Sequence, residues 1–139
     1  MSHYNKMEVI ELRRILYFIL IIISFIFVCG IKPEKEPDVV NSISLNRDYR
    51  LTVIANRNKI KDKVEFAEEL IQMCRENSFK TIKFSTDFGY ATEIRMTVYL
   101  SKADWKKGKA AMEISYIQDS LVKEYDIVNN PEKFEMTIK

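Results

Sequence analysis

The feature that most constrains this chain is an uncharged apolar run from Ile15 to Ile31, directly preceded by Arg13 and Arg14. As a helix, its 17 residues would extend about 25 Å, close to the ~30 Å hydrocarbon core of a bilayer. A helix that is apolar on every side has no polar face to turn toward water. The run therefore predicts a transmembrane or signal-anchor helix, with residues 1–14 as a short cytoplasmic tail.

The sequence leaves three fates open for this segment. It is retained as an anchor, cleaved after Gly30 as a secretory signal, or cleaved before a lipidated Cys29. The residues before Cys29 resemble a bacterial lipobox at Ile26 only, because the bulky Val28 stands where Gly or Ala is expected. The apolar stretch exceeds the 7–15 residues usual for a signal peptide, which favours retention.

The charges beside this run predict the orientation of the chain. Arg13 and Arg14 favour an N-terminus on the cytoplasmic side. Pro33 and Pro37, among alternating charges, predict an extended spacer over residues 32–42. Residues 43–139 are then expected to form an extracytoplasmic domain at the cell membrane. This layout resembles, in outline only, that of short single-anchor proteins of bacterial surfaces.

The charge balance excludes one class of partner. The formal net charge is +2, and the residues after Ile31 contain 19 Lys or Arg and 18 Asp or Glu. Binding to nucleic acid needs a clearly basic face. We therefore expect no nucleic-acid partner, and instead an unknown protein or envelope ligand together with the membrane at Ile15–Ile31.

Hydrophobic periodicity in the remaining residues predicts an α+β domain. Alternating residues indicate strands within 43–55, 81–85, 92–101, 110–118 and 134–138, and residues 61–77 have helical spacing. The order β-α-β-β-β-β with short late turns favours a small antiparallel sheet with one helix packed on one face. Residues 119–128 fit neither pattern.

The helix has the clearest local signals. Asp62 is the expected N-cap, with Glu65 three residues later. A buried stripe is expected from residues at helical spacing: Val64, Ala67, Leu70, Ile71 and Cys74, widened by Phe66 and Met73. Cys74 is then a core residue, and Met73, Met96, Met112 and Met136 also have core-facing phases.

Several catalytic chemistries lack their residues. The one histidine is His3, before the apolar run, so no imidazole serves catalysis or a metal site in the folded part. Gly30, Gly89 and Gly108 are too far apart for a phosphate-binding loop. We therefore expect no cofactor, no metal and no enzymatic activity. The one enzymatic alternative is a small hydrolase that uses Asp87 and Glu93 as paired carboxylates.

Two groups of residues are candidates for binding. Arg95 and Tyr99 share the polar face of the strand at 92–101, opposite the expected core. Trp105, Lys106 and Lys107 form a local basic-aromatic cluster that suits an anionic surface. The sequence thus predicts a membrane-anchored, extracytoplasmic, non-enzymatic binding module. The alternative is an accessory subunit of a larger membrane or envelope assembly.

Overall fold

A computed structural model of the chain describes residues 9–21 and 35–139. The chain divides into two units after Pro33. Residues 9–21 form a helix that includes Arg13, Arg14 and the first seven residues of the predicted anchor, whereas residues 22–31, with Cys29, lie outside the described residues. In the parts of the chain that the structure describes, no helix is long and apolar enough to cross a membrane.

The C-terminal unit is built on a five-stranded sheet whose strands follow the order of the sequence. These are β1 (Asp38–Leu45), β2 (Asp48–Ile54), β3 (Glu93–Tyr99), β4 (Met112–Gln118) and β5 (Phe134–Ile138). The helices are α2 (Lys63–Glu76), the short α3 (Lys102–Lys106) and the 3-10 turn η1 (Pro131–Lys133). The predicted α+β class is confirmed.

The sheet is mixed, so the prediction of an antiparallel sheet is wrong at one pair. β2 and β3 are parallel, with Asp48 beside Glu93 and Ile54 beside Tyr99; the other three pairs are antiparallel. Parallel neighbours need a crossover connection. Here α2 and the segment after it provide that connection, because they return the chain to the end of the sheet where β2 began.

The predicted strand at residues 81–85 is also absent, and this segment is a loop. The side chain of Asn77, the C-cap of α2, accepts from the backbone N–H of Phe84 at 2.8 Å and donates to its carbonyl at 3.1 Å. These bonds replace a strand ladder. Ile82 and Phe84 nevertheless pack against the core, as their alternation predicts.

Residues 43–55 belong to a hairpin whose first strand starts earlier than expected, at Asp38 inside the predicted spacer. Asn46, with φ of 57°, begins the two-residue turn. A bulge between Val39 and Asn41 shifts the register and reverses the side-chain alternation in the rest of β1. The two-residue turn pairs Ile43 with Arg50 and Leu45 with Asp48, on the face opposite the core, so these two side chains are exposed by 61% and 74%.

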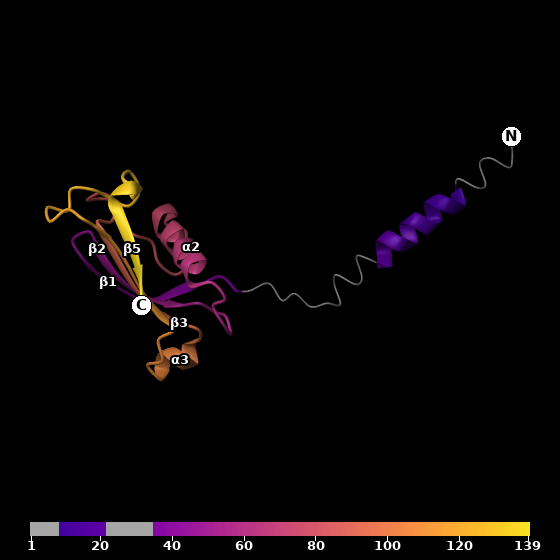
Figure 1. Ribbon diagram of the computed structural model, residues 1–139, viewed down its shortest axis with the longest axis horizontal. Coiled ribbons are helices and arrows are strands. Elements are labelled where there is room, and N and C mark those ends of the chain that lie inside the picture. Colours follow the sequence, from indigo (N-terminus) through magenta and orange to yellow (C-terminus); the bar gives the residue numbers. More distant parts are fainter. Residues whose placement is uncertain (1–8, 22–34) are drawn as a thin grey trace. The chain divides into compact units, whose positions relative to one another are not determined.

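The core lies between α2 and one face of the sheet (Figure 1). The predicted N-cap is confirmed, since Asp62 accepts from the backbone N–H groups of Val64 and Glu65 at 2.9 and 3.0 Å. The buried stripe differs at one position. Phe66 is buried, whereas Val64 in the first turn is 53% exposed.

The sulfur-containing residues of the C-terminal unit lie in the core or at its edge, as predicted. Cys74 is buried, and its desolvation raises the pKa of its thiol. Met96 and Met112 are buried as well, and the partly buried Met73 and Met136 pack against the core at its edge. The thiol of Cys74 is therefore a packing group with little thiolate character.

Replacing Leu70, which is fully buried at 0% exposure, tests the packing of α2. We expect Leu70→Ala to lower the free energy of unfolding by about 2–5 kcal/mol, because it removes a buried side chain and leaves a cavity. Val64→Ala on the same helix should change it by less than about 0.5 kcal/mol. Urea denaturation followed by circular dichroism measures both; equal losses would contradict this packing.

Candidate functional site

Within residues 35–139, no helix covers the centre of the sheet face opposite α2 (Figure 1). We call it the open face. It contains a shallow hollow of about 400 Å³ across four strands. The side chains that line this hollow alternate with the core residues of the same strands: Asn41, Ile43, Arg50, Thr52, Arg95, Thr97, Glu113 and Ser115.

Two arginines stand side by side in the hollow. Arg50 of β2 is in register with Arg95 of β3, and both are exposed. Like charges directly opposite each other destabilise a sheet. The Nε of Arg95 donates to Glu93, which offsets its charge. The side chain of Arg50 makes no hydrogen bond or ion pair within residues 9–21 and 35–139.

An acidic group faces this pair from the other side of the hollow. Glu113 of β4 is exposed and is in register with Thr97. Among the described residues its carboxylate has no ion pair. Strand spacing places its Cα about 12 Å from that of Arg50. The hollow thus has a cationic side and an anionic side.

The residues between these charges are short and polar. Thr52 of β2 and Thr97 of β3 are in register, and Asn41 of β1 continues their row across the sheet. Ser115 of β4 continues the neighbouring row, which contains the two arginines. Hydroxyl and amide groups both donate and accept hydrogen bonds. The hollow can therefore hold a polar ligand by hydrogen bonds and ion pairs, but it is too shallow to exclude water.

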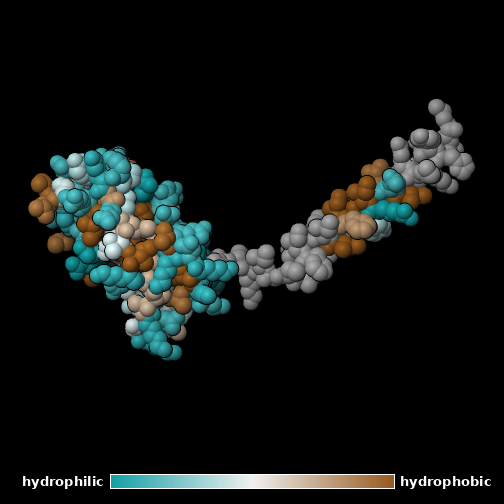
Figure 2. All heavy atoms as spheres, viewed as in Figure 1, coloured by the Kyte–Doolittle hydropathy of each residue, from teal (hydrophilic) through white to brown (hydrophobic). Residues whose placement is uncertain are grey.

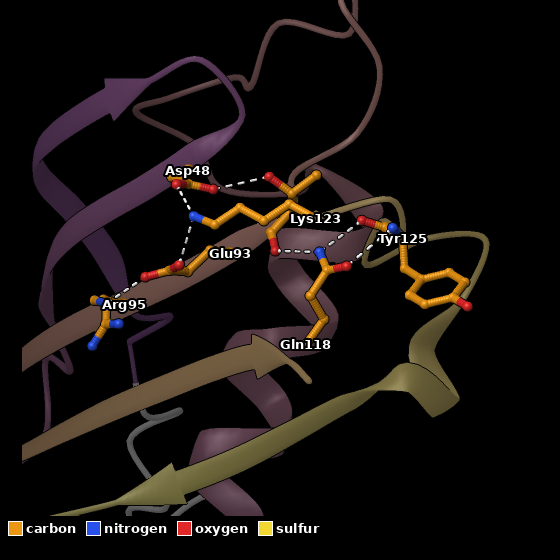
Figure 3. Close-up of polar contacts among 7 residues, drawn as sticks. Asp48, Glu93, Arg95, Gln118, Lys123 and Tyr125 are labelled. Atoms are coloured by element: carbon orange, nitrogen blue, oxygen red, sulfur yellow. Dashed lines mark hydrogen bonds and ion pairs between the residues drawn. The ribbon is translucent and has the colours of Figure 1, made fainter. Parts of the chain in front are cut away.

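A second charged cluster lies at the end of the sheet where β2 and β3 begin (Figure 3). Asp48 and Glu93 are neighbours in register, and the Nζ of Lys123 donates to both, at 2.9 Å to Glu93. These hydrogen bonds raise the pKa of Lys123. Burial raises the pKa of Glu93, but the hydrogen bonds from Lys123 and Arg95 outweigh it, so the pKa is lowered.

The loop that carries Lys123 is fastened to the sheet by a buried amide. The Nε2 of Gln118 donates to the carbonyls of Thr92 and Tyr125, both at 2.9 Å, and its Oε1 accepts from the N–H of Tyr125 at 3.0 Å (Figure 3). This explains why residues 119–128 show no periodicity. Side-chain contacts hold the loop, and the sequence gives no sign of such long-range pairs.

Three connections meet at this same end. The N–H of Thr92 donates to the carbonyl of Arg47 at 2.9 Å, and that of Ile127 donates to Ala91 at 3.0 Å. Phe88, Leu121 and Val122 are strongly exposed in these loops. Figure 2 shows apolar atoms projecting there, at the edge of the unit that carries the β1–β2 turn in Figure 1. These exposed apolar side chains belong to the loops at this end of the sheet, and none of them lines the hollow.

The structure separates the residues that the sequence predicts for binding. Arg95 lines the hollow, and Tyr99 lies on the same face about 13 Å further along β3, half-buried. Trp105, Lys106 and Lys107 belong to α3 and the residue after it, outside the hollow. Cys29 lies outside the described residues.

The main residue missing from the sequence-based candidates is Arg50. The alternation of Tyr49, Leu51 and Val53 already places it on the outer face of its strand. Only the parallel pairing of β2 with β3 brings it beside Arg95, and no local pattern predicts that pairing.

The carboxylates proposed for the hydrolase alternative are engaged separately. Asp87 accepts from the Oγ of Ser85 at 2.9 Å, whereas Glu93 contacts two cations that lower its pKa. No cluster of three potential metal ligands occurs in the described ranges. Comparison with protein-family models, curated proteins and solved structures found no match for this chain.

The lowered pKa of Glu93 predicts a pH effect on stability. A carboxylate whose pKa is depressed by folding stabilises above its unfolded pKa of about 4.3 and loses that effect as the pH falls through the folded value. Wild type should therefore be more stable than Glu93→Gln at pH 7. The difference should shrink below about pH 4, as measured by thermal unfolding across pH. A difference that stays constant from pH 7 to pH 3 would argue against the cluster.

Proposed function

We propose that this chain is a membrane-anchored, extracytoplasmic, non-enzymatic binding module that holds a polar partner on the open face of its sheet. The uncharged run Ile15–Ile31 and the preceding Arg13 and Arg14 support the anchor and the orientation. Lipidation at Cys29 or cleavage after Gly30 would alter the attachment of the domain but not its binding surface. The mass of the mature chain distinguishes these fates.

The observation that carries the proposal is the pairing of Arg50 with Arg95 on an uncovered face. A face that only had to be soluble gains nothing from like charges side by side, since opposite charges there would stabilise the sheet. The repulsion between the two arginines is offset when a ligand supplies negative charge. A carboxylate that bridges two guanidinium groups forms strong, charge-assisted hydrogen bonds.

Glu113 narrows the class of partner. A purely anionic ligand would be repelled on that side of the hollow, about 12 Å from Arg50. The surface instead suits a partner that presents a carboxylate to Arg50 and a cationic group to Glu113. A protein segment with both charges, such as one on an envelope protein, has this chemistry.

The shallow shape of the hollow supports binding without catalysis. Catalytic sites gain their electrostatic effects by excluding water, and this hollow lies open across the sheet. Glu93, at the start of β3 and outside the lining of the hollow, accepts hydrogen bonds from Arg95 and Lys123, and its lowered pKa makes it a poor proton donor.

Site-specific photocrosslinking in intact cells tests the proposal. A photoreactive amino acid is placed at Ser115 in the hollow and, as the matched control, at Glu68 on the exposed side of α2. We expect a discrete adduct from position 115 and none from position 68. Equal adducts from both positions, or none from either, would contradict the proposed surface.

Variants of the two unpaired charges make the test sharper. Arg50→Ala and Glu113→Gln should each reduce the adduct from position 115 by about tenfold. That factor corresponds to the free energy lost with one charge-assisted hydrogen bond. Lys63→Ala, which removes an exposed cation on α2, should leave it unchanged. Replacing Ile15–Ile31 by an unrelated anchor should preserve the adduct of a binding module, whereas an assembly subunit held by its anchor would lose it.

A further inference from the structure

β1 is an edge strand without the usual protection against pairing. In natural proteins, charged residues, proline or a covering element generally prevent an edge strand from pairing with another strand. From Val39 to Asn46 the chain has eight consecutive uncharged residues and no proline. The opposite edge, β5, carries Glu135 and is followed by Lys139. β1 is therefore the edge that is open to another strand.

The start of β1 is covered, but the rest of the strand is not. The Oγ1 of Thr81 donates to the carbonyl of Val39 at 2.6 Å, and the bulge follows directly. Residues 41–45 are all exposed. Helix α2 lies nearest β4 and β5, at the other side of the sheet. No helix of residues 35–139 therefore obstructs an approach to this edge.

The hairpin geometry decides which backbone groups of β1 point outward. A two-residue turn is closed by a hydrogen-bonded pair, here Leu45 and Asp48. Antiparallel pairs alternate between bonded and non-bonded, so Ser44 and Ser42, opposite Tyr49 and Leu51, direct their N–H and C=O groups away from β2. The edge thus presents two adjacent outward-facing sets of donors and acceptors.

We propose that β1 pairs antiparallel with β1 of a second copy of this chain, about a twofold axis at Ile43. Ile43 then faces its own copy, Ser42 faces Ser44, and Asn41 faces Leu45. The outward amides of Ser42 and Ser44 form the hydrogen-bonded rungs. The two sheets become one; this assembly goes beyond the proposed binding function and rests on it only for the membrane attachment of the chain.

The side chains of β1 fit a second copy in this register. Antiparallel self-pairing brings each residue opposite a fixed partner, and the absence of charge from Val39 to Asn46 means that no like charges meet. Ile43 and Leu45, exposed by 61% and 74% in the single chain, gain cross-strand neighbours. Apolar side chains opposite one another stabilise a sheet.

The same axis would join the two binding surfaces. A twofold axis perpendicular to the sheet keeps both open faces on one side. Asn41 and Ile43 line the hollow of each copy, so the two hollows would meet at the shared β1 edge. A pairing of five residues is a small contact compared with the ~1,600 Å² of a standard interface. Attachment to one membrane would favour it by raising the effective concentration.

Disulfide trapping tests the register with the full chain in phospholipid vesicles, in a Cys29→Ser background. Ile43→Cys should form a covalent dimer under mild oxidation. Ser42→Cys alone should form at least fivefold less covalent dimer, because residue 42 lies opposite Ser44 of the second copy. A mixture of Ser42→Cys and Ser44→Cys chains should form the covalent dimer readily. Equal trapping at positions 42 and 43, or none at 43, would overturn the proposal. Cys74 is buried and common to all variants.

A charge exchange separates self-pairing from capture of a foreign strand. Ile43→Lys and Ile43→Glu should each abolish the dimer that crosslinking detects in vesicles, since the same charge would meet across the axis. Mixing the two variants should restore it. A dimer unaffected by either variant would assign the contact to another surface, such as Ile15–Ile31. A wild-type chain that stays monomeric, or a mixture that does not recover, would equally overturn the pairing.

Discussion

The burial of the apolar stripe of α2 against one face of the sheet is the interaction on which the rest of this structure depends. Because the helix lies between β2 and β3 in the chain, its docking returns the chain to the end where β2 began. β3 therefore runs parallel to β2. This single pairing sets Asp48 beside Glu93 and Arg50 beside Arg95. Because α2 docks on one face, no helix of residues 35–139 covers the centre of the other.

The repulsion within these two pairs of like charges is compensated in different ways. The carboxylates of Asp48 and Glu93 share the ammonium group of Lys123, so repulsion within the sheet becomes a link that fastens a long loop. Arg95 also donates to Glu93, but Arg50 has no such partner in the described part of the chain. The charge of Arg50, which has no ion-pair partner in the described residues, lies on the open face. This contrast supports a binding surface there over a face that only contacts solvent.

The sequence predicts those parts of the fold that depend on local spacing. The Asp62 N-cap, the core position of Cys74 and the outward phase of Arg95 each follow from the spacing within a single element. The parallel pairing of β2 with β3 and the contacts of Lys123 and Gln118 join distant segments, and the bulge in β1 interrupts its alternation. No periodicity encodes them, so Arg50 and the β1 edge emerge only from the three-dimensional arrangement. The expected membrane anchor over Ile15–Ile31 remains a prediction.

Occupation of the open face by a partner in the cell is the central proposal, and cysteine protection tests it most directly. Thr97→Cys at the centre of the hollow and Glu68→Cys on α2 are labelled with a polar maleimide in a Cys29→Ser background. Both positions should react in the purified chain. In native membranes, position 97 should be protected at least tenfold while position 68 still reacts. Equal labelling of position 97 in both preparations would contradict the account.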